Sequence, residues 1–141
     1  MSRFIAQLVI VTISIVGLIH VYWALGGRVV GAAAVPKIDG HRAFSPSKWA
    51  TFAVAVALFA AAALVAVAAR LLANPFPPAY VRIITILLGT LFIARSIGDF
   101  RLVGFFKRTT TSRFARLDTA VYSPLCLALG LGVLFVALQH V

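Results

Sequence analysis

The stretch Ile83-Ile-Thr-Ile-Leu-Leu-Gly-Thr-Leu-Phe-Ile-Ala94 continues directly into Arg95-Ser-Ile-Gly-Asp99, so a largely apolar run ends on an arginine and an aspartate. A run of this kind is typical of a membrane-spanning helix. Ionisable groups inside or at the rim of such a helix are costly, so they are usually buried against a partner and often mark a functional site. This stretch therefore predicts a membrane protein and its first candidate site.

The composition of the whole chain also indicates a membrane protein. Of the 141 residues, 62% are hydrophobic and 11% are charged, whereas soluble domains carry about 25% charged residues. The 13 basic residues outnumber the three acids, Asp39, Asp99 and Asp118, and give a net charge of +10. Because the basic residues lie between apolar runs, we expect them to contact membrane lipids through anionic headgroups, and we do not expect nucleic-acid binding.

Four segments are long enough to cross a hydrocarbon core of about 30 Å, which takes about 20 helical residues. They are residues 4–25, 50–69, 79–100 and 119–140. The predicted fold is all-α, a membrane-embedded bundle of four transmembrane helices running up-down-up-down, with residues 1–141 forming a single membrane domain. Aromatic side chains that anchor helices at the membrane interface are expected near the span ends, at Tyr22, Trp23, Trp49 and Tyr80.

The loop charges predict an orientation. One side of the bundle carries Arg3, Arg70 and Arg82. The other side carries Arg28, Lys37, Arg42, Lys48, Arg101, Lys107, Arg108, Arg113 and Arg116. The positive-inside rule places this larger set in the cytoplasm, so both termini are expected on the outer side of the membrane.

Small residues recur within two of the spans. Ala53, Ala57 and Ala61 are spaced four apart in the second span, and Ala128 and Gly132 lie in the fourth. Small side chains let helices approach closely in lipid, so these positions are expected to pack against other helices. The alternative is that alanine fills the second span without a packing role.

Polar residues gather at the predicted cytoplasmic end of the spans. This polar cluster consists of His20, Arg95, Asp99, Asp118 and Tyr122. Arg95 is one helical turn from Asp99 and is expected to bond to Asp99 or Asp118, and Asp118 is expected to cap the N-terminus of the last span. Two roles stay open: an ion-paired lock between spans three and four, or a pocket that binds an anionic or polar headgroup or relays protons.

Sequence motifs assign no chemistry to the chain. No CxxC, HExxH, P-loop or GxGxxG pattern occurs, so no metal and no cofactor is predicted. If the protein is an enzyme, its acid and base candidates are His20, Asp99, Asp118 and Tyr122. We expect first an accessory protein that binds a lipid or a partner membrane protein. The alternatives are a small proton, ion or solute transporter acting as a homo-oligomer and, least expected, an enzyme acting on a lipid-soluble substrate.

Three blocks carry a resemblance to a known family. They are His20-Val-Tyr-Trp-Ala-Leu-Gly-Gly27, then Arg95-Ser-Ile-Gly-Asp-Phe-Arg101 with Gly104-Phe-Phe-Lys107, and finally Phe114-Ala-Arg-Leu-Asp-Thr119 with Tyr122-Ser-Pro-Leu125. In these blocks the chain resembles a bacterial family of small, uncharacterised four-span integral membrane proteins, a domain of unknown function. The resemblance implies the architecture and a location in a bacterial cytoplasmic (inner) membrane. It implies no substrate.

Overall fold

The computed structural model describes residues 2–27, 35, 37–39, 41–42, 45–98, 102–108 and 110–140. Its elements are α1 (Ser2–Ala24), β1 (Lys37–Ile38), β2 (His41–Arg42), α2 (Lys48–Ala68), α3 (Pro78–Ile97), α4 (Arg113–Leu117), the π-helix η2 (Asp118–Tyr122) and α5 (Ser123–His140). β1 and β2 pair antiparallel over two residues each, and α4, η2 and α5 follow one another without a break. Within the described residues, four helices are long and apolar enough to cross a membrane. The predicted four-span, all-α class is confirmed, apart from this small ladder.

The helix ends follow local chemistry, and two of them differ from the prediction by three residues or more. α3 ends at Ile97 rather than at residue 100, because Gly98 adopts φ 87°. The last span starts at Arg113 rather than at residue 119, because the Ser112 side chain accepts a hydrogen bond from the Ala115 N–H. Ser112 is therefore the N-cap. The expectation that Asp118 caps this helix is wrong, since Asp118 lies inside it.

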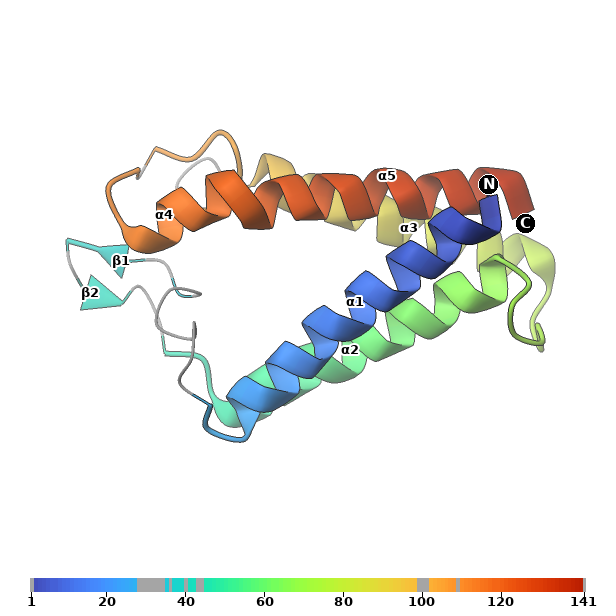
Figure 1. The fold of residues 1–141 in the computed structure, drawn as a ribbon, viewed down its shortest axis with the longest axis horizontal. Coiled ribbons are helices and arrows are strands. Elements are labelled where there is room, and N and C mark those ends of the chain that lie inside the picture. Colours follow the sequence, from blue (N-terminus) through green and yellow to red (C-terminus); the bar gives the residue numbers. More distant parts are fainter. Residues whose placement is uncertain are drawn as a thin grey trace.

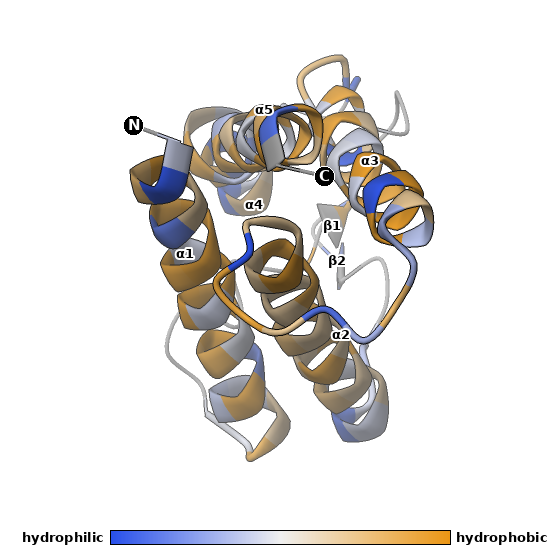
Figure 2. Cartoon of the chain, turned by 90° about the vertical axis from the view of Figure 1, so that its right-hand side faces the viewer, coloured by the Kyte–Doolittle hydropathy of each residue, from blue (hydrophilic) through white to orange (hydrophobic). Residues whose placement is uncertain are grey.

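The four helices pack as two antiparallel pairs, α1 with α2 and α3 with α5. Figure 1 shows that the pairs meet at the end of the molecule that holds both termini, and that they diverge toward the opposite end, where α4 and the β1–β2 ladder lie. In the end-on view of Figure 2, α1 and α5 are neighbours and α2 lies beside α3. The molecule is thus a wedge that opens between the pairs.

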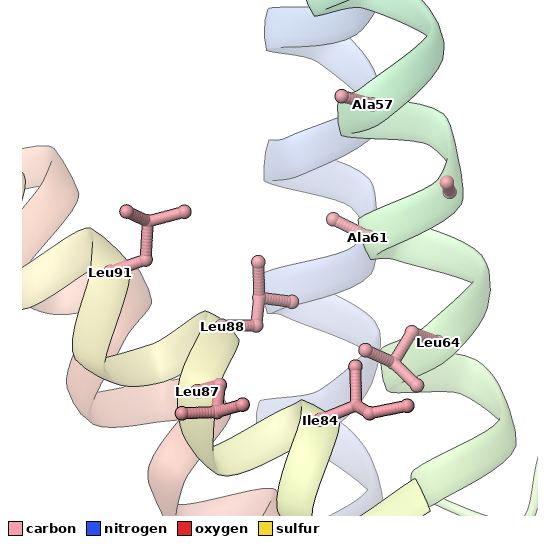
Figure 3. A pocket seen from close by; sticks show the side chains of 8 residues that line it. Ala57, Ala61, Leu64, Ile84, Leu87, Leu88 and Leu91 are labelled. Carbon is pink, nitrogen blue, oxygen red and sulfur yellow. The ribbon is translucent and has the colours of Figure 1, made fainter.

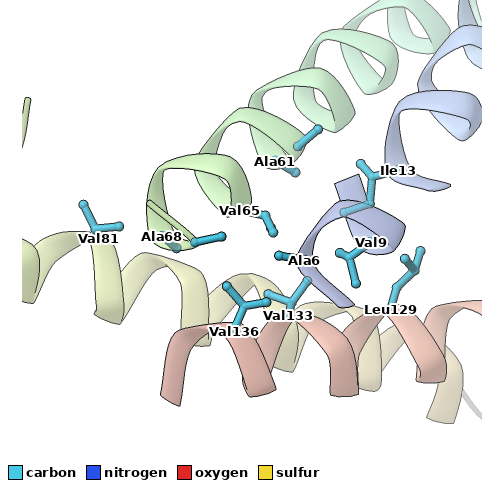
Figure 4. Close-up of a cluster of buried hydrophobic side chains, with 12 residues drawn as sticks. Ala6, Val9, Ile13, Ala61, Val65, Ala68, Val81, Leu129, Val133 and Val136 are labelled. Atoms are coloured by element: carbon cyan, nitrogen blue, oxygen red, sulfur yellow. The ribbon is translucent and has the colours of Figure 1, made fainter. Parts of the chain in front are cut away.

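The hydrophobic core lies where the two pairs meet (Figure 4). It consists of Ala6, Val9, Ile13, Ala61, Ala62, Val65, Ala68, Ala69, Val81, Leu129, Val133 and Val136. α1 contributes residues from its first half and α2 residues from its second half. The remaining halves of these two helices stay outside this core, which is why the pairs can separate toward the other end.

Glycines rather than alanines set the closest helix contacts. A Cβ on Gly130 of α5 would lie 2.8 Å from the Gly89 carbonyl oxygen of α3, and one on Gly132 would lie 2.6 Å from Val9 Cγ2 of α1. The packing role expected for Gly132 is therefore present. In α2, however, only Ala61 of the predicted stripe is buried, and Ala128 of α5 is exposed.

α2 ends in a Schellman motif with an arginine at the position that usually holds glycine. Arg70 has φ 58°, and the N–H groups of Leu71 and Arg70 donate to Ala66 O at 2.9 Å and Val67 O at 3.0 Å. We expect Arg70→Gly to raise the free energy of unfolding by about 0.5–1 kcal/mol, because the left-handed conformation strains a side chain with a Cβ. Denaturant titration in micelles measures this, and Arg70→Ala, which keeps the Cβ, should show no gain.

Candidate functional site

The candidate site is centred on Asp118, whose side chain is fully buried. Its Oδ1 accepts a hydrogen bond from Arg95 Nη2 at 2.9 Å. Its Oδ2 accepts from the Gly104 N–H at 2.7 Å and from Lys107 Nζ at 3.1 Å. Burying a carboxylate is costly unless it is paired and hydrogen-bonded. Here two cations and one amide compensate the single charge, so Asp118 joins α3, the following loop and the last span.

Two glycines fold the loop after α3 around this carboxylate. Gly98 has φ 87° and Gly104 has φ 92°. A Cβ on Gly98 would lie 1.7 Å from the Val103 carbonyl oxygen, so the backbone passes here without room for a side chain. The loop then turns back, with the Phe105 N–H donating to Ser96 O at 2.9 Å. This path brings the Gly104 amide to the carboxylate.

Lys107 is held in place by the same loop. Its side chain is 2% exposed, and its ammonium also donates to Gly104 O at 3.0 Å and to the Thr119 hydroxyl. An ammonium has three donors, and all three find acceptors here. Lys107 is therefore a structural cation of the site rather than a solvated loop charge.

The last span contains a π-turn at the site. η2 covers Asp118–Tyr122, and the Ser123 N–H donates to Asp118 O across it. The side chains of Asp118 and Ser123 are therefore one π-turn apart on the same side of the helix. π-turns of this kind occur frequently at functional sites.

Three buried polar atoms have no hydrogen-bond partner among the described residues. One belongs to Arg95, which is bonded to Asp118, and the other two belong to residues that follow Asp118 on the same helix. The three atoms are Arg95 Nη1, Tyr122 OH and Ser123 Oγ. An unsatisfied buried polar group costs about 1–3 kcal/mol. The Arg95 side chain as a whole is 35% exposed, so it connects the buried ion pair with the surface. The site thus has hydrogen-bonding capacity that the described chain does not use.

An apolar groove runs between α2 and α3 and has a volume of about 620 Å³. Its lining residues are Ala57, Ala60, Ala61, Leu64, Ile84, Leu87, Leu88 and Leu91. Figure 3 shows Leu64 and Ile84 facing each other at one end, with Ala57 and Leu91 farther apart at the other. The groove thus widens in the direction in which the helix pairs diverge.

Of the predicted polar cluster, the structure brings Arg95 and Asp118 together, with Tyr122 one turn further along. His20 lies on α1, in the other helix pair, where its Nδ1 is 2.8 Å from Val16 O and its ring packs edge-on against Trp23. It is therefore not part of the ion-paired site. Asp99 lies outside the described residues, so its expected pairing with Arg95 is not described.

Sequence reasoning missed two contributors, the Lys107 ammonium and the Gly104 amide. A signal was present, because a chain with 13 basic and three acidic residues is expected to surround any buried acid with more than one cation. Which cation reaches Asp118 depends on the turn at Gly98. Single-sequence patterns do not specify that turn.

The predicted interfacial aromatic residues lie near helix ends. Tyr22 is 45% exposed, Trp49 is 82% exposed and Tyr80 is 63% exposed, whereas Trp23 is half-buried against His20. Large exposed aromatic side chains at these positions suit a lipid–water interface.

The four apolar helices indicate a multi-pass membrane protein. Residues 13–133 match the model of the family described as "Protein of unknown function (DUF3995)", and because this match covers most of the chain, the chain belongs to that family. No curated protein and no solved structure matches the chain. The family description assigns no activity, so the function is argued from the site.

Proposed function

We propose that this protein binds a membrane phospholipid, with a hydrocarbon chain of the lipid lying in the groove between α2 and α3. The groove itself carries this proposal. Its volume of about 620 Å³ falls within the range of roughly 300–1,000 Å³ typical of ligand sites. All of its lining side chains are alanine, leucine or isoleucine, which suits a hydrocarbon chain.

Packing physics supports an occupant of this kind. Groups that line an unfilled space lose dispersion contacts with the atoms that would fill it. In a bilayer, lipid chains surround the helices and are the material available to fill a laterally open groove. Ala57 and Ala60 of α2 are exposed and have short side chains, so they leave room for a hydrocarbon chain of the lipid.

The proposal includes a location. The protein would be a single membrane domain in a bacterial inner membrane, with both termini outside and the wide end of the wedge in the cytoplasmic leaflet. The basic residues near that end would contact anionic headgroups. A partner membrane protein or a second copy of the chain is the alternative occupant that the experiment below distinguishes.

Neither alternative function has comparable support. An enzyme acting in the groove would need an acid or base there, and the groove-lining residues offer none. A proton or ion relay would need polar groups along the whole bundle. In the half of the bundle that holds the hydrophobic core, Thr85 is the only buried polar side chain among the described residues. Its hydroxyl donates to Val81 O within α3.

Filling the groove should displace the lipid. We expect Ala57→Phe to abolish retention of a bound phospholipid, because the ring occupies the space of the hydrocarbon chain. Native mass spectrometry of the full chain, extracted gently from its own membrane, measures the retained lipid per protein. Ala63→Phe is the matched control, since Ala63 is exposed on α2 but does not line the groove.

Three outcomes of this experiment test whether a lipid binds in the groove. Lipid loss in Ala57→Phe with retention in Ala63→Phe supports the proposal. Equal retention in both variants contradicts it, because the lipid would then bind elsewhere. A polypeptide bound in fixed ratio and lost only in Ala57→Phe would also contradict it, and would identify the groove as a protein interface.

A further inference from the structure

We infer that the bound lipid is an anionic phospholipid whose phosphate group contacts Arg95 at the wide mouth of the groove. This inference rests on the proposed lipid function and adds the headgroup class and the residue that recognises it. It is carried by the position of Arg95, by its anchoring and by its unused donors.

Helical spacing places Arg95 at the mouth. Ile84, Leu88 and Leu91 line the groove along one face of α3. Arg95 lies four residues beyond Leu91, so it continues this face by one turn toward the wide end. A lipid with its chain along these side chains would bring its headgroup to the depth of Arg95.

The ion cluster of Arg95, Lys107 and Asp118 fixes Arg95 but uses only part of its hydrogen-bonding capacity. A guanidinium has five N–H donors, and one of them, on Nη2, is fixed by Asp118 Oδ1 at 2.9 Å. Nη1 is buried and has no partner among the described residues, while the side chain is 35% exposed. An arginine anchored at one nitrogen presents the others at a fixed position, which suits a phosphate group.

The charge balance of the described site also favours an anion. Arg95 and Lys107 both pair with the single carboxylate of Asp118. Among the described residues the cluster therefore carries one surplus positive charge. The Ser123 hydroxyl, one π-turn from Asp118, is likewise buried without a partner among the described residues. Asp118 and Lys107 act as positioning residues for Arg95.

The test measures headgroup preference separately from lipid retention. Purified full-length protein is equilibrated with equal amounts of phosphatidylglycerol and phosphatidylcholine that carry identical acyl chains, and native mass spectrometry gives the ratio of the two bound lipids. Both lipids carry the phosphate, but phosphatidylcholine also carries a quaternary ammonium. The surplus positive charge repels this ammonium, which predicts a preference of about tenfold for phosphatidylglycerol. We expect Arg95→Gln to reduce the ratio to about one, and Arg82→Gln, which removes the same charge at the other end of α3, to leave it unchanged.

A second pair of variants keeps the Arg95–Asp118 ion pair and so does not depend on the folding of Arg95→Gln. Leu91→Glu places a carboxylate one turn before Arg95, where it can take the free donors and repel a phosphate. Thr90→Glu places the same charge at nearly the same depth on an exposed position outside the groove. We expect the preference to be lost in Leu91→Glu and kept in Thr90→Glu.

The failures are distinguishable. If wild type retains a phospholipid without headgroup preference, this inference is wrong and the groove proposal stands. If wild type retains no phospholipid, both are wrong. A preference that survives Arg95→Gln or Leu91→Glu would also overturn the inference. If lipid retention and the preference survive Ala57→Phe as well, anionic lipid is binding to the basic loops.

Discussion

Asp118→Asn is expected to lower the free energy of unfolding by about 3–5 kcal/mol, because it removes the only charge that compensates a buried lysine among the described residues. The Lys107 side chain is 2% exposed, and its ammonium lies 3.1 Å from Asp118 Oδ2. Asparagine keeps the shape of aspartate, so the loss reports the charge rather than a cavity. Denaturant titration in mixed micelles measures the change.

Two further variants make this prediction specific. Asp39→Asn is the matched control: Asp39 is exposed at φ 51°, a conformation that asparagine tolerates, so stability should change little. Lys107→Met combined with Asp118→Asn should recover part of the loss, since a buried ion pair replaced by apolar groups is often tolerated. A double variant no more stable than Asp118→Asn would contradict the view that the uncompensated lysine causes the loss.

Gly98→Ala is expected to cost about 3 kcal/mol or more, which makes it the second large effect. The new Cβ would lie 1.7 Å from the Val103 carbonyl oxygen and would add strain at φ 87°. Because the clash is with backbone, the loop must move, and the Gly104 amide and Lys107 would move with it. Thermal unfolding of the variant in detergent measures the loss.

Gly26→Ala separates the clash from the strain. Gly26 has φ 98°, but a Cβ there would have nothing within 4 Å, so this variant carries conformational strain alone. We expect it to cost about 1–3 kcal/mol, clearly less than Gly98→Ala. Equal losses in the two variants would show that the close approach of the loop backbone contributes nothing to stability.

Local chemistry explains which helix ends were predicted well. The end of α1 near Gly26 and the start of α3 at Pro78 follow from residues that favour those positions. The start of the last span was misplaced because the basic residues Arg113 and Arg116 suggested a loop. Ser112 nonetheless caps a helix there. The basic residues therefore led the prediction to overlook Ser112 as an N-cap.

The candidate site was predicted in part for a similar reason. Arg95 and Asp118 are a cation and an acid in apolar surroundings, and such groups must find partners. His20 was grouped with them by its predicted depth alone. Depth does not specify which helix pair a residue belongs to, and α1 diverges from α3 and α5 at that end (Figure 1).

The sequence by itself determined the number of spans, the all-α class and the need of Arg95 for a partner, because apolar length and the cost of buried charge act locally. The tertiary structure decided the rest. The wedge, the groove walled by Ala57 and Leu91, and the burial of Lys107 depend on how segments far apart in the chain pack. Close glycine contacts such as Gly89 with Gly130 set that packing, and in lipid no hydrophobic drive between helices specifies it in advance.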